Sequence, residues 1–127
     1  MKKAVAVPLF VLLTILGFTL YNSFFMNQNA ARWCGQLQQA VLFLRSEEWD
    51  HVKSALEQSY SDWSAHQTYL HIVSTHDGIN AAESMYCRAL AFTATQEPSE
   101  LQAEIADLQA QLRFLAEMEQ FSIHNIL

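Results

Sequence analysis

Hydrophobic and polar positions are distributed very unevenly along this 127-residue chain. After two N-terminal lysines, no charged residue occurs until Arg32, and residues 4–21 are almost entirely apolar. A helix needs about 20 apolar residues to cross the hydrocarbon core of a bilayer, because each residue rises only about 1.5 Å. A helix also satisfies all the backbone polar groups of such a segment internally. The pattern therefore predicts a transmembrane helix, which we assign to residues 4–26.

The flanking sequence predicts how this helix is oriented. Positive residues stay on the cytoplasmic side, so we expect residues 1–3, with Lys2 and Lys3, to be cytoplasmic and residues 27–127 to be extracytoplasmic. A cleaved signal peptide is the alternative, but its apolar core is usually about 7–15 residues long and ends in an A-x-A-like site. The apolar run here is longer, and Asn29 stands where a small residue is needed. We favour a retained signal anchor at the cell membrane.

Aromatic side chains are enriched where membrane helices meet water. Four aromatic residues follow the apolar run, so we expect them to form a belt at the outer end of the span: Tyr21, Phe24, Phe25 and Trp33.

The remainder of the chain has helical periodicity. Apolar residues recur at intervals of three and four, which places each set on one face of a helix. The four stripes are Cys34, Leu37, Val41 and Leu44; Trp49, Leu56, Trp63 and Leu70, with Val52 and Val73 alongside; Ile79, Ala82, Tyr86 and Leu90; and Leu101, Ile105, Leu108, Leu112 and Leu115. No alternating strand pattern competes. The predicted fold class is all-α, an N-terminal transmembrane helix followed by a small antiparallel helical bundle.

Capping residues and turn residues predict where the helices begin. Ser46 can cap a helix that continues to the end of the second stripe, and Asp77 can cap the next one. Pro98 suits the first position of the following helix, because that residue needs no intrahelical N–H bond. Ser122 can cap a short final turn, and we expect the apolar tail, residues 121–127, to dock on the bundle.

The charge of the extracytoplasmic part excludes some partners. Without the two N-terminal lysines, five basic residues face 13 acidic ones, a formal net charge of −8. Binding to nucleic acid requires clustered Lys and Arg, so we expect no nucleic-acid partner. Anionic lipid headgroups should also repel the domain, which leaves membrane lipid as a partner through the anchor alone.

Several of these features together resemble a known family. They are the Glu48-Trp49 pair, Trp63, His76 with Ile79, and the tail EMEQFSIHNIL, all behind an N-terminal anchor. The arrangement is similar to a family of Gram-positive bacteria known as domain of unknown function 4363, over essentially the whole chain. The resemblance implies a small membrane-anchored helical protein and transfers no activity or catalytic residue.

The two cysteines, Cys34 and Cys87, lie on or beside two different apolar stripes. Disulfides persist outside the cytoplasm, and a bond would form if the Cα atoms came within about 4.4–6.8 Å. The alternative is two free, buried cysteines that serve as small apolar residues. Sequence spacing leaves both readings open.

Five histidines raise the question of a metal site. His66, His71 and His76 are five residues apart, which turns successive side chains by about 140° around a helix. The one-face zinc pattern H-E-x-x-H is absent. We therefore expect no metal and no cofactor.

Catalytic motifs are also absent from the sequence. His76-Asp77 could be half of a catalytic pair, but both residue types also suit a turn between helices. No nucleophile stands in a G-x-S-x-G context, and no Gly-rich phosphate loop occurs. We expect that the protein is not an enzyme.

One polar and aromatic seam remains as a candidate binding surface: Trp49, Trp63, His66 and His76. Tryptophans at heptad spacing are more often core residues, and we expect both to be mostly buried against the first and last helices. An exposed seam would suit a protein partner, whereas a closed pocket would suit a ligand. We predict an interaction or scaffolding module for another membrane or envelope protein, with a small-molecule-binding helical bundle as the alternative.

Overall fold

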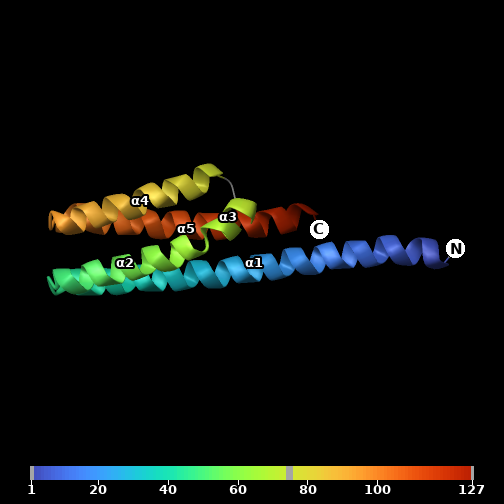
Figure 1. The fold of residues 1–127 in the computed structure, drawn as a ribbon, viewed down its shortest axis with the longest axis horizontal. Coiled ribbons are helices and arrows are strands. Elements are labelled where there is room, and N and C mark those ends of the chain that lie inside the picture. Colours follow the sequence, from blue (N-terminus) through green and yellow to red (C-terminus); the bar gives the residue numbers. More distant parts are fainter. Residues whose placement is uncertain (1, 74–75, 127) are drawn as a thin grey trace.

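The computed structural model describes residues 2–73 and 76–126, with side chains for residues 2–70 and 76–118. These residues form five helices and no strand, which confirms the all-α fold class (Figure 1). The helices are α1 (Lys2–Arg45), α2 (Trp49–Ala65), α3 (Gln67–Val73), α4 (His76–Ala94) and α5 (Pro98–Ile126).

The 44-residue helix α1 has two parts with different surroundings. Its N-terminal part projects alone beyond the bundle (Figure 1). The large apolar side chains of this part are exposed. Buried positions begin at Asn22 and then recur every three or four residues to Leu44. By length and composition α1 can cross a membrane, and its most apolar stretch is entirely unburied. The first part thus suits lipid and the second part suits a bundle core.

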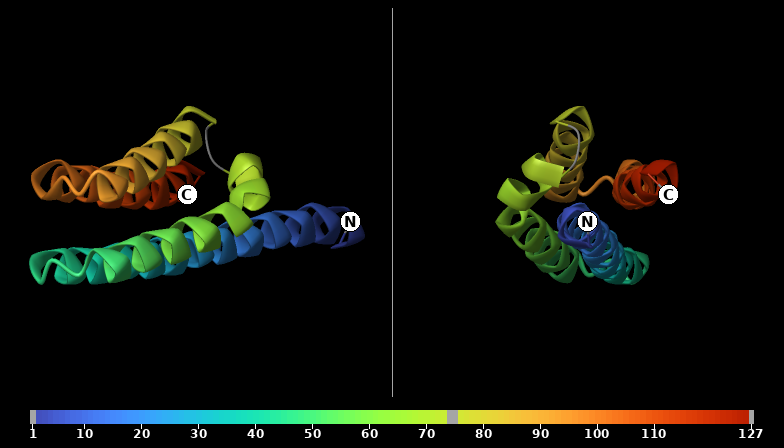
Figure 2. Two further views of the ribbon diagram at one scale, coloured as in Figure 1. Left: turned by 60° about the vertical axis from the view of Figure 1, so that its left-hand side comes forward. Right: turned by 90° about the vertical axis from the view of Figure 1, so that its right-hand side faces the viewer.

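Four helices form the bundle as two antiparallel hairpins, α1–α2 and α4–α5. The hairpins lie side by side, with both of their turns at the same end (Figures 1 and 2). Helix α1 packs on α2 and α5, and α4 packs on α5 and α2. Among the described residues the diagonal pairs, α1 with α4 and α2 with α5, have no Cα atoms within 8 Å. The short helix α3 contacts α2 and α4.

The predicted apolar stripes form the bundle core. Trp49 and Leu90 are only partly buried, and the Val73 side chain lies outside the described part of the chain; every other stripe residue is buried. The largest fully buried side chains come from all four bundle helices and α3: Met26, Trp33, Leu37, Leu56, Trp63, Leu70, Ile79, Tyr86, Leu101, Ile105, Leu108 and Leu112. Burial of each such side chain contributes about 1.5–3 kcal/mol.

The two hairpin turns have the same backbone geometry. Glu47 and Gln96 adopt positive φ angles of 57° and 54°, two residues after the ends of α1 and α4. The N–H of Glu48 donates to Phe43 O at 3.0 Å, and the N–H of Glu97 donates to Phe92 O at the same distance. These are the hydrogen bonds of a Schellman motif, which ends a helix and reverses the chain.

The two hairpins also match in their pattern of burial. A constant separation of 49 positions relates eight buried residues of one hairpin to buried residues of the other: Ala30 to Ile79, Trp33 to Ala82, Leu37 to Tyr86, Ala40 to Ala89, Val52 to Leu101, Leu56 to Ile105, Ser59 to Leu108 and Trp63 to Leu112. The same offset relates the two turns. The bundle is therefore an internal repeat of one helical hairpin with pseudo-two-fold symmetry.

The structure corrects several predicted helix boundaries. The second helix does not continue through the second stripe, because it ends at Ala65 and the chain restarts as α3 after His66. Glu48 occupies the N-cap position of α2, so Ser46 is not the cap. Asp77 lies inside the first turn of α4 rather than before it.

The last helix is partly as predicted. Helix α5 begins at Pro98, as expected for a residue that tolerates the first helical position. It then continues without a break to Ile126, so the prediction of a separate final turn capped by Ser122 is wrong. The docking of residues 121–127 depends on side chains outside the described part of the chain.

Two predicted tryptophan environments are also corrected. Trp33 is only 1% exposed inside the bundle, so it does not belong to an aromatic belt. Trp63 is fully buried, as predicted, but α2 packs on α1 and α4 rather than on the last helix. The reason is the pseudo-symmetric arrangement, which puts α2 diagonally opposite α5.

We expect Trp63→Ala to lower the free energy of unfolding by about 3–5 kcal/mol, because it removes a buried aromatic side chain. Trp49→Ala is the matched control and should cost clearly less, since Trp49 is partly exposed. Thermal unfolding of the full chain in detergent measures both. Equal melting temperatures for Trp63→Ala and the wild type would contradict the described core.

Candidate functional site

The structure disperses the four residues of the predicted seam. Trp49 is partly buried beside the turn, whereas Trp63 lies 14 residues away, about 21 Å along the helix axis. His66 is partly buried between α2 and α3, and His76 is exposed at the start of α4. These residues do not converge on one site.

Trp63 is part of a packed aromatic core. Its ring centroid lies 5.3 Å from that of Tyr86 and 6.3 Å from that of Tyr60. The Tyr86 hydroxyl shares a buried 2.8 Å hydrogen bond with Ser59, and burial raises the pKa of Tyr86 well above its usual value. This cluster joins α2 to α4 and accounts for the polar Ser59 on an otherwise apolar stripe.

The two cysteines are both free and lie on the diagonal helices α1 and α4. Cys34 is buried against α5, where Gln109 Nε2 donates to Cys34 O at 3.2 Å. Burial raises the pKa of the Cys34 thiol, although Arg113 partly opposes this. Cys87 is exposed. The disulfide alternative is therefore not realised in this structure, and only Cys34 fills the role of a buried apolar residue.

A polar network ties α1 to the end of α2. Arg32 donates to both carboxylate oxygens of Asp62, from Nε at 2.7 Å and from Nη2 at 3.0 Å. Gln36 Nε2 donates to the same carboxylate at 3.2 Å, and His66 Nδ1 lies 2.8 Å from Asp62 O. Burial alone would raise the pKa of Asp62, but the hydrogen bonds and charge of Arg32 outweigh it and lower that pKa. The network fixes the end of α2 against α1.

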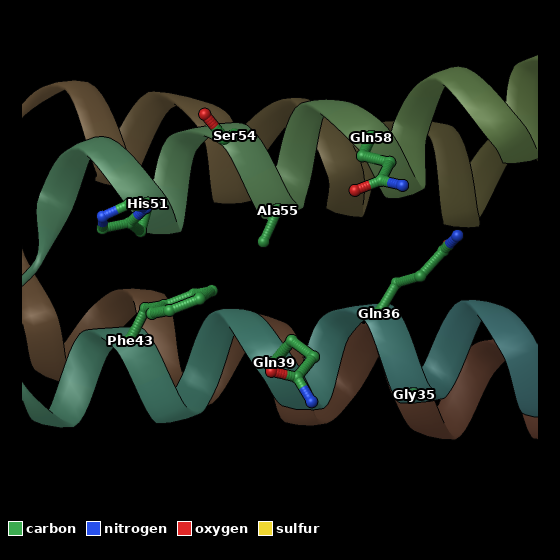
Figure 3. Close-up of a pocket in the computed structure, with 8 residues that line it drawn as sticks. All are labelled: Gly35, Gln36, Gln39, Phe43, His51, Ser54, Ala55 and Gln58. Carbon is green, nitrogen blue, oxygen red and sulfur yellow. The ribbon is translucent and has the colours of Figure 1, made fainter.

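A groove runs between α1 and α2 on the outer surface of the bundle. It has a volume of about 570 Å³ and is lined by Gly35, Gln36, Gln39, Phe43, His51, Ser54, Ala55 and Gln58. Figure 3 shows Gln36 and Phe43 of α1 pointing toward α2 across the groove.

The groove offers neutral hydrogen-bonding groups beside an aromatic surface. The amides of Gln39 and Gln58 and the hydroxyl of Ser54 supply both donors and acceptors, whereas the amide of Gln36 donates to Asp62. The Phe43 ring stacks on His51, with centroids 5.1 Å apart and an interplanar angle of 27°. None of the described residues that line the groove is acidic, lysine or arginine. Among the described residues, no group of three or more His, Cys, Asp or Glu is arranged to hold a metal ion.

The pseudo-symmetric hairpin shows why this groove is open. Between α4 and α5, Arg88 Nε lies 2.8 Å from Glu104 Oε1 and bridges the two helices. The residues 49 positions earlier are Gln39 and Ala55, which form no such bridge. The position of Gly35 is likewise open, because an added Cβ would meet nothing within 4 Å. The groove thus carries small or neutral residues at the two positions where the other hairpin carries an ion pair.

The sequence reasoning did not find this groove. Its residues lie outside the apolar stripes, where polar residues are normally solvated and carry no signal. The 49-residue repeat in the apolar pattern could have pointed to the groove. It aligns Gln39 and Ala55 with the charged pair Arg88 and Glu104.

Comparison with known proteins gives one result. The model of a family described as Domain of unknown function (DUF4363) matches residues 21–126, which confirms the resemblance seen in the sequence. The match begins one residue before the first buried position of α1 and includes all of the bundle. No curated protein and no solved structure matches the chain.

We expect two labelled thiols per chain after denaturation without reductant. In the native protein Cys87 should react with a maleimide quickly, and Cys34 should react orders of magnitude more slowly, because it is buried and its pKa is raised. Mass spectrometry of the labelled protein counts the modified sites. Cys87→Ser should abolish the fast reaction. If neither cysteine is labelled after denaturation without reductant, the two cysteines form a disulfide.

We expect Asp62→Asn to lower the free energy of unfolding at pH 7 by about 1 kcal/mol or less, because its partner Arg32 is partly exposed. The pKa of Asp62 is lower in the folded than in the unfolded state, so its contribution is complete above the unfolded value, about 3.9. It is lost as the pH falls through the folded value.

Urea unfolding of both proteins between pH 2 and pH 7 tests this dependence. The difference in free energy of unfolding between the wild type and Asp62→Asn should disappear at the acidic end of this range. Glu57→Gln, which alters the exposed pair with Lys53, is the control and should have no measurable effect. A constant difference at all pH values would contradict the lowered pKa.

Proposed function

Because the chain belongs to the family described as Domain of unknown function (DUF4363), we propose its function from its own geometry, as a single-pass membrane-anchored interaction module. Its partner is another membrane or envelope protein. The observation that carries this proposal is the open groove between α1 and α2, on a bundle that shares an unbroken helix with the apolar segment.

The anchor is supported by the composition and exposure of α1. Its apolar N-terminal part is unburied and follows Lys2 and Lys3, which favour the cytoplasmic side. In this proposal the segment is a retained signal anchor, and the bundle lies on the outer side of the cell membrane.

The unbroken helix gives the groove a fixed height above the membrane. Within the span assigned to residues 4–26, about 20 residues from Ala4 cross the hydrocarbon, so the residues after about Ser23 lie in the polar interface. Gln36 and Phe43 then lie about 20 and 30 Å farther along the axis. Because α1 contains no hinge between these points, a partner must present its binding surface at that height.

The chemistry of the groove suits a neutral, polar protein surface. Glutamine amides pair with backbone or side-chain amides of a partner, and Gly35 and Ala55 permit close approach. The desolvation cost is modest, because no charged side chain of the groove is buried on binding. The net charge of −8 outside the span disfavours nucleic acid as a partner.

A small polar molecule is the second candidate ligand for the same groove. Its volume of about 570 Å³ falls within the range of small-molecule sites, about 300–1,000 Å³. The buried Trp63 lies in the core and does not contribute to such a site.

The experiment uses a photo-crosslinking amino acid at Gln58, in membranes of the cells that produce the protein. The matched control places it at Asp107, the equivalent position on the other hairpin. The double variant Gln39→Arg with Ala55→Glu copies the Arg88–Glu104 bridge and should close the groove. We expect a discrete crosslinked protein from Gln58, none from Asp107, and a loss of at least tenfold in the double variant.

Crosslinking that is equal at the two positions, or unchanged in the double variant, would contradict a protein site in the groove. Saturable binding of a small polar molecule that the double variant abolishes, without a crosslinked protein, would favour the second candidate.

A further inference from the structure

A second hollow lies at the opposite end of the bundle from the hairpin turns. It has a volume of about 230 Å³ and is lined by Tyr21 and Phe25 of α1, Ala65 and His66 at the end of α2, and Tyr69 of α3. It shares no residue with the α1–α2 groove.

Aromatic rings form most of its surface. The Phe25 centroid lies 5.1 Å from that of Tyr69, edge to face, and 6.1 Å from that of His66. Tyr21 stacks on Phe25 at 6.2 Å and is 65% exposed. Through Tyr21 this surface is continuous with the exposed apolar face of the N-terminal part of α1.

The position of Phe25 along α1 gives the height of the hollow relative to the proposed span. If the hydrocarbon ends near Ser23, Phe25 lies about 3 Å beyond it. The polar interface of a leaflet is about 5–7 Å thick. Because the Tyr69 ring contacts Phe25, α3 reaches the same layer.

The chain changes direction at His66. Helix α2 runs antiparallel to α1, so it approaches the proposed membrane surface as the chain proceeds. Helix α3 turns away toward α4, as Figure 2 shows.

The charges around the hollow are compatible with lipid. Among the described residues that line it, none is acidic, lysine or arginine, and α3 has the sequence QTYLHIV. Tyrosine and other rings with an apolar body and a polar edge are the residues preferred at this depth. The Asp62 carboxylate lies 3.8 Å from His66 Nδ1, and its charge is paired with that of Arg32.

We infer that this aromatic hollow and α3 dock on the outer leaflet of the membrane that α1 spans, with the upper acyl chain of a phospholipid against Tyr21, Phe25 and Tyr69. The inference rests on the proposed membrane span. The docked end provides a second attachment point, which fixes the rotation of the bundle about α1 and hence the direction in which the groove faces.

The test uses the full chain with Cys87→Ser, one copy per phosphatidylcholine nanodisc, so that lipid is the sole available partner. A nitroxide spin label is attached at Ala65→Cys or, as a second reporter, at the exposed Thr68→Cys. The control is Ser54→Cys, about 16 Å farther from the membrane on the same helix. Collision rates with oxygen and with a water-soluble nickel chelate report depth.

We expect the ratio of oxygen to nickel collisions to be at least threefold higher at positions 65 and 68 than at position 54. Phe25→Ser combined with Tyr69→Ser should reduce it to the control value, while the protein still resists carbonate extraction.

Ratios at both reporters equal to that of the control, in a protein that resists carbonate, would overturn the docking alone. Release of the wild-type chain by carbonate would overturn the proposed span as well.

Discussion

The continuity of α1 is the constraint on which the rest of the structure depends. One unbroken helix is apolar on every side at its start and apolar on a single stripe from Asn22 onward. The second part can bury that stripe only by packing against other helices, and α2 and α5 pack on it. Because no hinge separates the two parts, the orientation of the bundle follows from that of the N-terminal segment.

The bundle solves this packing problem twice with the same unit. Two hairpins with matching Schellman turns, at Glu47 and Gln96, present equivalent buried positions 49 residues apart. Equivalent positions of the two hairpins are buried alike, but their side chains differ in chemistry. The hydrogen-bonded pair Ser59 and Tyr86 in one interface corresponds to Leu108 and Leu37 in the other. A buried hydrogen bond and an apolar contact thus occupy related places, which is tolerated because the buried hydroxyls satisfy each other.

The departures from this symmetry are informative about function. Arg88 and Glu104 bridge one hairpin, whereas Gln39 and Ala55 leave the corresponding surface of the other open. Near the proposed membrane surface, α2 ends early and α3 turns aside, without a counterpart in the continuous α5. These local differences between the hairpins give the groove at a fixed height above the proposed membrane and the aromatic hollow near the lipid. Together the two features support the proposal of a module that presents one surface to a partner.

The sequence by itself determined the apolar segment, the all-α class and most of the core, because helical periodicity depends only on local spacing. Leu56, Trp63 and Leu70 are buried as their stripe predicts. It could not determine which helices are neighbours, because that depends on how all the stripes pack at once; α2 therefore lies opposite α5, and Cys34 and Cys87 lie on diagonal helices. The seam failed as a site for the same reason, since Trp63 lies in the core, whereas His76 is exposed on another helix. Only the tertiary structure brought Gln36, Gln39 and Gln58 together, because the groove is formed between two helices whose polar faces show no periodicity of their own.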